Sequence, residues 1–236
     1  MLHSKRHHLR ALALAVAICA ALSGQAFAAS ATVTTLPSID SVLASIEKAF
    51  TTIKDITGSV DVDQVQVDGS VIKAKAKVEA MMLGMLRMTF LEPETFADSI
   101  FVFDKNNNIA IQYSPITEQA IYQRIEQVLT DRSIFRSVDQ LFSLPSPTDY
   151  DLKVIDSEVR NGVNHLLITA KSKNGSDSMF YQFWINQQTW LVTKLTIADK
   201  NGKLTMTITL SNIKTNLNLK ETTLKKMPPG TQILNR

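Results

Sequence analysis

The chain has 236 residues, with 25 lysines and arginines against 22 aspartates and glutamates, four histidines and a single cysteine. Three of the basic residues, three of the histidines and the cysteine fall within the first 28 residues, which hold no acidic residue. The rest of the chain is long enough for one domain with a sizeable core, and its 22 basic and 22 acidic residues balance. This neutrality speaks against nucleic acid and against anionic membrane surfaces as partners.

The first 28 residues have the order of a secretory signal peptide. Basic residues precede an apolar run over 11–22, and small residues follow at 26–29 around a cleavage site after Ala28. Cys19 lies inside the run after Ile18, whereas lipoprotein processing requires a small residue at that place, so Cys19 is interpreted as one more apolar residue. We therefore predict a cleaved signal peptide over 1–28 and a periplasmic or otherwise extracytoplasmic, thiol-free mature chain.

An amphipathic helix is predicted next. Residues 29–37 are small and polar, which predicts a flexible leader, and Ser38 is the expected N-cap of the helix. Gly58 is its expected stop. The apolar residues fall at helical spacing on one face: Ile39, Val42, Leu43, Ile46, Phe50 and Ile53.

From Gly58 onward apolar and polar residues alternate with a period of two, which is typical of half-buried strands. One long strand is predicted over 81–91, and two short helices are predicted over 118–144. The expected total is nine to eleven strands in successive hairpins. This predicts an α+β fold, in which a curled antiparallel β-sheet (an incomplete barrel) is covered by the N-terminal amphipathic helix and the short inserted helices. Hairpin turns are predicted at Asp68-Gly69, Asp104–Asn108, Arg160–Gly162, Asn174-Gly175 and Asp199–Gly202.

The chain after residue 28 offers little to catalysis. Its one histidine, His165, lies in a strand pattern and is predicted to be a surface residue. With no cysteine either, the usual zinc ligands and the usual Ser-His or Cys-His pairs are missing. The glycines are scattered, mostly in turns, and form no phosphate-binding loop. We expect no enzymatic activity, no cofactor and no metal.

Methionine is unusually dense in one place. Four methionines fall within eight residues of the strand predicted over 81–91: Met81, Met82, Met85 and Met88. One interpretation is a well-filled sheet core. The other is an adaptable apolar surface, because flexible and polarizable thioether side chains accept ligands of varied shape, such as acyl chains.

The order of these elements resembles the LolA-type periplasmic lipoprotein carriers and the related lipoprotein-sorting proteins. A signal peptide, an amphipathic helix and an antiparallel meander follow one another, and short motifs recur along nearly the whole mature chain. These motifs are Phe90-Leu-Glu-Pro93, Ile100-Phe-Val-Phe-Asp104, Ile109-Ala-Ile-Gln-Tyr-Ser-Pro115, Glu118-Gln119, Asp139–Leu144, Phe183–Asn186, Asn201–Ile213 and Pro228–Gly230.

The resemblance implies a LolA-like domain over 38–236 with a hydrophobic cavity beneath its helices. The implied function is a monomeric carrier that moves lipoprotein acyl chains or another lipid between envelope membranes, with membrane-bound donor and acceptor proteins as partners. The alternative is an envelope sensor or regulatory interaction module of the same fold. The lipid-binding residues that the resemblance implies are Met82, Leu86, Met88, Phe90, Ile109, Ile111, Tyr113, Leu43, Ile46, Phe50 and Phe142.

The chain departs from the family at one position. Carriers of the enteric type have an Arg-Pro pair whose arginine pins the lid helix by hydrogen bonds, and no Arg-Pro pair occurs in this sequence. Counting back from Pro93, the arginine position falls near Met82. Closure of the lid is therefore expected to depend on apolar contact alone.

Overall fold

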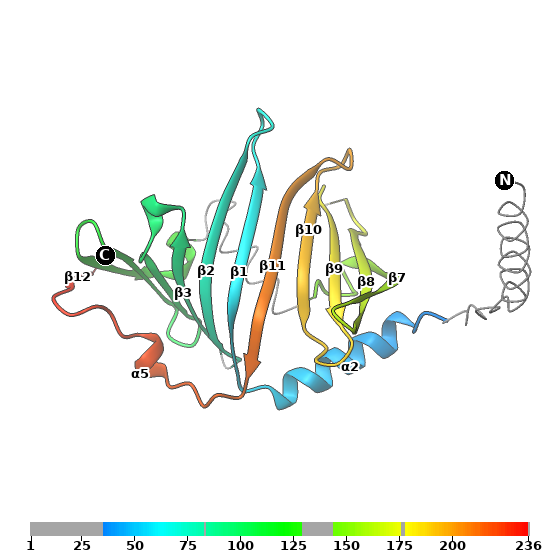
Figure 1. Ribbon diagram of the computed structural model, residues 1–236, viewed down its shortest axis with the longest axis horizontal. Coiled ribbons are helices and arrows are strands. Elements are labelled where there is room, and N and C mark those ends of the chain that lie inside the picture. Colours follow the sequence, from blue (N-terminus) through cyan, green and yellow to red (C-terminus); the bar gives the residue numbers. More distant parts are fainter. Residues whose placement is uncertain (1–34, 83, 129–143, 176–177, 236) are drawn as a thin grey trace, which may run out of the picture. The chain divides into compact units, whose positions relative to one another are not determined.

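Twelve β-strands form one continuous sheet in the computed structural model, which describes residues 35–82, 84–128, 144–175 and 178–235. The strand order is β12-β6-β5-β4-β3-β2-β1-β11-β10-β9-β8-β7, and every neighbouring pair is antiparallel except β6 with β12 (Figure 1). The sheet is curled and unclosed, so β12 and β7 are its two edges. The strands are β1 (Asp55–Val65), β2 (Val71–Met81), β3 (Met85–Glu92), β4 (Ile100–Asp104), β5 (Ile109–Ser114), β6 (Gln119–Arg124), β7 (Tyr150–Arg160), β8 (Val163–Ser172), β9 (Phe180–Asn186), β10 (Val192–Ala198), β11 (Leu204–Thr215) and β12 (Gln232–Asn235).

Helix α2 (Ile39–Thr52) precedes the sheet, and its N-cap is Ser38 as predicted, with the Ser38 side chain accepting a hydrogen bond from the Ser41 amide. The predicted stop at Gly58 is wrong, because Ile53 already has extended backbone and β1 begins at Asp55. Gly58 lies inside β1, where a Cβ would approach the Ser211 carbonyl oxygen to 3.0 Å, so the glycine permits close strand pairing. The other described helices are short: η1 (Glu94–Phe96), α3 (Ile125–Val128) and α5 (Glu221–Leu224).

Two sequence-based predictions of elements are corrected. The strand predicted over 81–91 is two strands, since the chain turns after Met81 and Gly84 has a φ of +105°, a conformation that favours glycine. The first helix predicted after residue 118 is mostly strand β6, because pairing with β5 and β12 overrides the helical spacing of its apolar residues. The second falls in 129–143, outside the described residues.

The inner face of the sheet, the face that α2 covers, holds the main hydrophobic core. Alternate residues of β1–β4 and of β8–β11 meet there in one cluster with Val42 and Ile46 of α2. The C-terminal end of α2 packs beside Ile56 of β1, and the helix also contacts β7. One apolar helix face therefore packs against both β1 and β7.

The outer face of β3–β6 is covered by residues 216–231, which we call the C-terminal strap. Leu219, Leu224 and Met227 of the strap pack against a second buried cluster. That cluster consists of Met85, Ile100, Val102, Ile111, Tyr113 and Ala120. The strap leads into β12, which pairs with β6 at the edge of the sheet.

Polar side chains of the sheet, two of them buried, hold the strap in place. Asp55 accepts hydrogen bonds from the Leu217 and Leu219 amides at 2.6 and 3.1 Å. Arg87 donates to the carbonyl oxygens of Leu224 and Lys226 at 2.8 and 2.7 Å. Asp104 binds the Lys225 ammonium at 2.6 Å. These bonds satisfy polar groups that would be costly to bury unpaired.

The Asp104 contact predicts acid sensitivity. Burial by itself raises the pKa of Asp104, but the hydrogen bonds from Lys225 and Asn107, with the Lys225 charge, outweigh it and hold the pKa below its ordinary 3.8. The unfolded chain therefore binds this proton more readily, so the stabilisation is complete above about pH 4 and is lost as the pH falls through the folded-state pKa. In urea titrations, the stability difference between wild type and Asp104→Asn should shrink between about pH 7 and about pH 3. A constant difference would contradict this assignment.

Candidate functional site

The inner-face side chains of β2, β3 and β4 form an apolar surface. This surface includes part of the lipid-binding strand that was predicted from the sequence. Leu86, Met88 and Phe90 all point to the inner face and are buried. They pair with Ala80, Val78 and Ala76 of β2, and Leu86 and Met88 also pair with Phe103 and Phe101 of β4. The structure thus brings three predicted residues together and adds the two phenylalanines of β4.

Helix α2 contributes further side chains to the same inner cluster. Ile46 is buried, and Leu43 and Phe50 are half-buried and pack against the inner cluster. Val42 is fully buried on the same helix face, although it was absent from the predicted site; its helical spacing is the signal that could have found it. Among the described residues, no hydrogen bond or ion pair joins an α2 side chain to the sheet.

The predicted grouping of Ile109, Ile111 and Tyr113 with this surface is wrong. They belong to the outer cluster beneath the C-terminal strap. The register of β4 with β5 pairs Phe103 with Ala110, so Ala110 takes the inner position and its neighbours point outward. The alternation of apolar residues in β5 shows that Ile109, Ile111 and Tyr113 share one face of the strand. It does not show whether that face is the inner or the outer face of the sheet.

The methionines are divided between separate places. Met88 is on the inner face and Met85 is in the outer cluster. Met82 lies in the turn after β2, not in a strand, and packs near Ala49 and Phe50 at the end of α2. Phe142 lies outside the described residues.

One small cavity on the inner face is formed by described residues alone. A cavity of ≈ 10 Å³ is lined by Val60, Val62, Ala74, Lys75, Ala76, Met88 and Phe90. This is about the space needed by one water molecule. An acyl chain requires far more room than this cavity offers.

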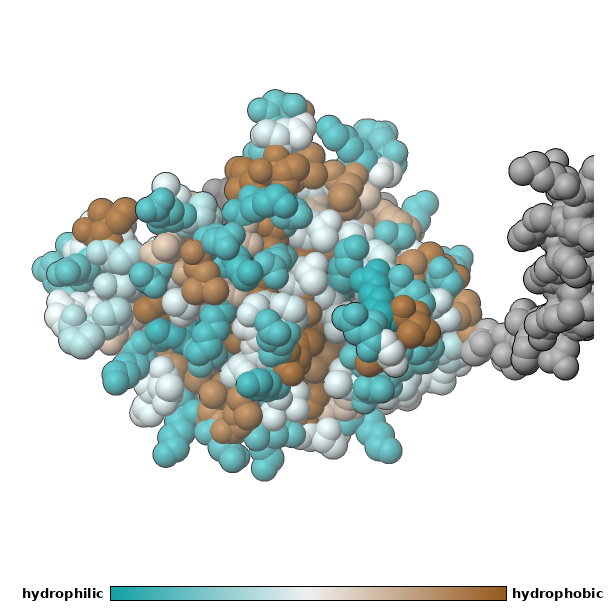
Figure 2. Space-filling model, viewed as in Figure 1, coloured by the Kyte–Doolittle hydropathy of each residue, from teal (hydrophilic) through white to brown (hydrophobic). Residues whose placement is uncertain are grey.

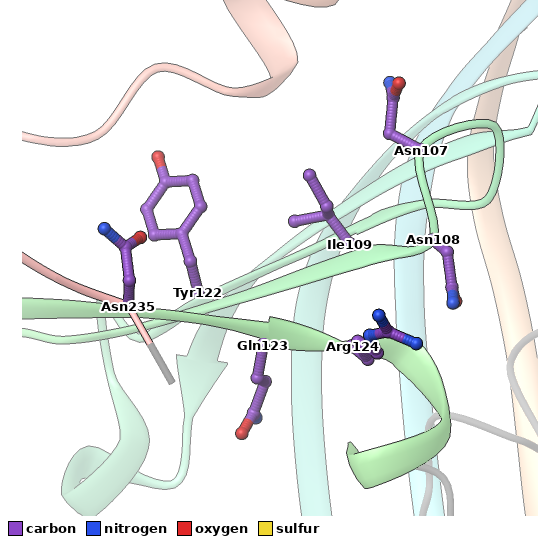
Figure 3. A pocket seen from close by; sticks show the side chains of 7 residues that line it. All are labelled: Asn107, Asn108, Ile109, Tyr122, Gln123, Arg124 and Asn235. Carbon is purple, nitrogen blue, oxygen red and sulfur yellow. The ribbon is translucent and has the colours of Figure 1, made fainter.

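A larger hollow of ≈ 440 Å³ lies at the β5–β6 edge, lined by Asn107, Asn108, Ile109, Tyr122, Gln123, Arg124 and Asn235. Figure 3 shows that these side chains do not converge: Tyr122 and Ile109 point to one side of the sheet and Gln123 to the other. The hollow therefore lacks the focused set of polar groups that a small-molecule site needs.

His165 is 7 % exposed, so its predicted surface position is wrong; its Nδ1 lies 3.1 Å from the Val163 carbonyl oxygen. Within the described ranges, no group of three or more His, Cys, Asp and Glu side chains could hold a metal ion. In the same part of the chain, no helix has the length and apolar character to span a membrane.

Comparison of the sequence with protein-family models and with curated proteins found no match. Among solved structures, an uncharacterized conserved protein from Thermus thermophilus matches with a TM-score of 0.58 at 15% identity, over 84% of this chain and 98% of that chain. A putative outer membrane lipoprotein-sorting protein domain from Vibrio parahaemolyticus matches with a TM-score of 0.47 at 10% identity, over 78% and 95%. A LolA superfamily protein from Nitrosomonas europaea matches with a TM-score of 0.42 at 12% identity, over 81% and 99%.

The likeness to the Thermus protein is one of fold. The architecture that the LolA-type resemblance implied, a curled, unclosed antiparallel sheet with few helices, is the one observed.

Proposed function

We propose that the protein is exported by its N-terminal signal peptide and carries lipid between envelope membranes, holding acyl chains between the inner face of the sheet and helix α2. The observation that carries this proposal is that the α2 side chains pack on the inner cluster through apolar contacts. The cargo is the acyl chains of a lipoprotein or another lipid, delivered and received by membrane-bound partner proteins. No catalytic step is required.

In this proposal α2 is a lid that covers the inner face. Its apolar contacts allow a ligand to take its place. Hydrophobic contacts are non-directional, so an acyl chain can replace the Val42 and Ile46 side chains on the inner face at little net cost. A lid fixed by buried hydrogen bonds would instead leave polar groups unpaired on opening. The missing Arg-Pro pair fits this mode of closure.

The polar contacts of the lid are concentrated at its C-terminal end. The Lys54 amide donates to Asn216 Oδ1 at 2.7 Å, and Asn216 Nδ2 donates to the Thr52 carbonyl oxygen at 3.3 Å. The Met82 amide donates to the Lys54 carbonyl oxygen at 2.9 Å. One end of α2 is thus anchored to the sheet and to the strap, so the rest of the helix can leave the inner face as a unit.

The proposal is tested by the lipid content of the protein isolated from the extracytoplasmic fraction of expressing cells. Mass spectrometry of a solvent extract should find acyl lipid in roughly stoichiometric amount, and a delipidated sample should bind a fluorescent fatty acid. A protein that holds no lipid and binds no such probe would contradict carriage. If it instead copurified in a stable complex with a membrane protein, the sensor alternative would be supported.

A further inference from the structure

Four of the turns that are described in full lie at the same end of the sheet. Antiparallel pairing makes β1, β3, β5 and β10 run toward this end, so the turns over 66–70, 93–99, 115–118 and 199–203 gather there. The turns β1–β2 and β10–β11 are the two tips at the top of Figure 1. We call these turns, with the strand residues next to them, the turn rim.

The turn rim exposes an unusual amount of apolar side chain. Of the twelve large hydrophobic residues that are exposed in the described part of the chain, seven lie on it. Val67 is 101% exposed and Ile116 82%. In Figure 2, apolar surface gathers close to the tip of the β1–β2 hairpin. The seven residues are Val67, Val71, Ile72, Leu91, Phe96, Ile116 and Leu204.

The backbone of the most exposed turn is closed by its own hydrogen bonds. The Gln66 amide donates to the Ser70 carbonyl oxygen at 2.8 Å, and the Gly69 amide donates to the Gln66 carbonyl oxygen at 3.0 Å. The Ser70 amide donates to Asp68 Oδ1 at 2.9 Å. Such a turn brings few unpaired polar groups into an apolar environment, which lowers the cost of partial insertion.

An apolar path leads from the turn rim to the inner face. The Phe96 ring lies 6.4 Å from the Phe90 ring, and Phe90 lies 5.6 Å from Phe101. Phe90 and Met88 also line the small inner cavity. An acyl chain that arrived at the rim would therefore meet apolar side chains all the way to the proposed lipid site.

The charges and spacing of the turn rim favour a bilayer as its partner. Its turns hold five acidic residues and two basic residues, so the rim is net acidic and does not complement an anionic surface; the acidic residues are Asp68, Glu94, Asp98, Glu118 and Asp199, and the basic ones are Lys200 and Lys203. The apolar residues stand on separate turns, which a protein groove could accommodate only with matching pockets. A lipid interface accepts separate apolar tips at any spacing.

We propose that the turn rim docks on the surface of a lipid bilayer, with Val67, Ile116 and Phe96 reaching the boundary between headgroups and acyl chains. The inference rests on the proposed function for its purpose, since docking places the inner face next to the lipid to be exchanged. The net acidic charge of the turns predicts that docking does not require anionic lipid.

Flotation with vesicles of phosphatidylcholine and phosphatidylethanolamine tests the proposal, using protein isolated after export. Wild type should float with the vesicles, and Val67→Asp/Ile116→Asp should lower the bound fraction tenfold or more, since two exposed apolar contacts are lost. Val67→Trp should raise it, because tryptophan favours the interface. Val159→Asp is the matched control: Val159 is 72% exposed beside the turn at the opposite end of the sheet, and its substitution should leave flotation unchanged.

Docking is overturned if wild type does not float, if the double variant floats as well as wild type, or if Val159→Asp lowers flotation equally. Lipid content, measured separately in the same samples, keeps the two proposals apart. Bound lipid without flotation overturns docking alone. Rim-dependent flotation without bound lipid supports docking and contradicts lipid carriage.

Discussion

Val42→Asp should release helix α2 and raise the affinity of the delipidated protein for a fluorescent fatty acid about tenfold or more. Val42 is completely buried, and a carboxylate there would lose its hydration without gaining a partner. Because only apolar contacts hold α2 side chains to the sheet, moving the helix outward relieves this cost. The inner face then becomes available without competition from the lid, and titration of the probe measures the change.

Ala44→Asp provides the control for charge on the same helix. Ala44 is exposed, so its carboxylate stays in water and the affinity for the probe should equal that of wild type. Circular dichroism should show the strand signal retained in both variants, because the ladders of the sheet do not depend on α2. Unchanged probe binding by Val42→Asp, or loss of the strand signal, would show that α2 is a fixed part of the core and not a lid.

The lid and the hairpins could be predicted because their signals are local. The apolar face of α2 repeats at helical spacing after a serine N-cap, and Asp68-Gly69 forms the predicted turn between β1 and β2. Such signals require only neighbours in the chain. These local signals identify the apolar face of α2 and the alternating strands, and so they identify the α2 residues of the proposed site.

The faces of β5 could not be predicted in this way. Ile111 and Tyr113 are apolar and alternate properly, yet they are buried by the strap, which lies more than a hundred residues further along the chain. Arg87 likewise lies in a predicted strand and Asp104 in a predicted hairpin turn. Their actual partners are strap groups, Leu224, Lys226 and Lys225, whose arrival the local sequence does not indicate.

Strand β6 shows the same limit. Ile121 and Ile125 are four residues apart, as on a helix face, but Ile121 pairs with Gln112 of β5 and with Leu234 of β12. Tertiary pairing decided the structure of a segment whose own pattern was ambiguous. The helix that forms the proposed lid could therefore be predicted from neighbouring residues. Which side chains face inward on the sheet depends on contacts between distant parts of the chain.

The largest effect on stability is expected from Lys225→Met, which should lower the free energy of unfolding by about 2 kcal/mol. The Asp104 side chain is 1% exposed and would keep only its contacts with Asn107, whereas the Lys225 side chain is 35% exposed. Breaking a fully buried pair costs about 3–5 kcal/mol, and partial hydration of the lysine reduces that figure here. Urea titration at about pH 7 measures the difference.

A double-mutant cycle separates loss of the charge pair from loss of the strap as a whole. Asp104→Asn/Lys225→Met leaves no unpaired charge, so the double variant should be more stable than the sum of the two single effects predicts. Lys220→Met, an exposed lysine of the same strap, should change stability by less than about 0.5 kcal/mol. Additive single effects would mean that Asp104 does not depend on Lys225. Strong coupling would establish that a buried carboxylate in β4 fastens the strap over the outer face, leaving the inner face as the surface that can open.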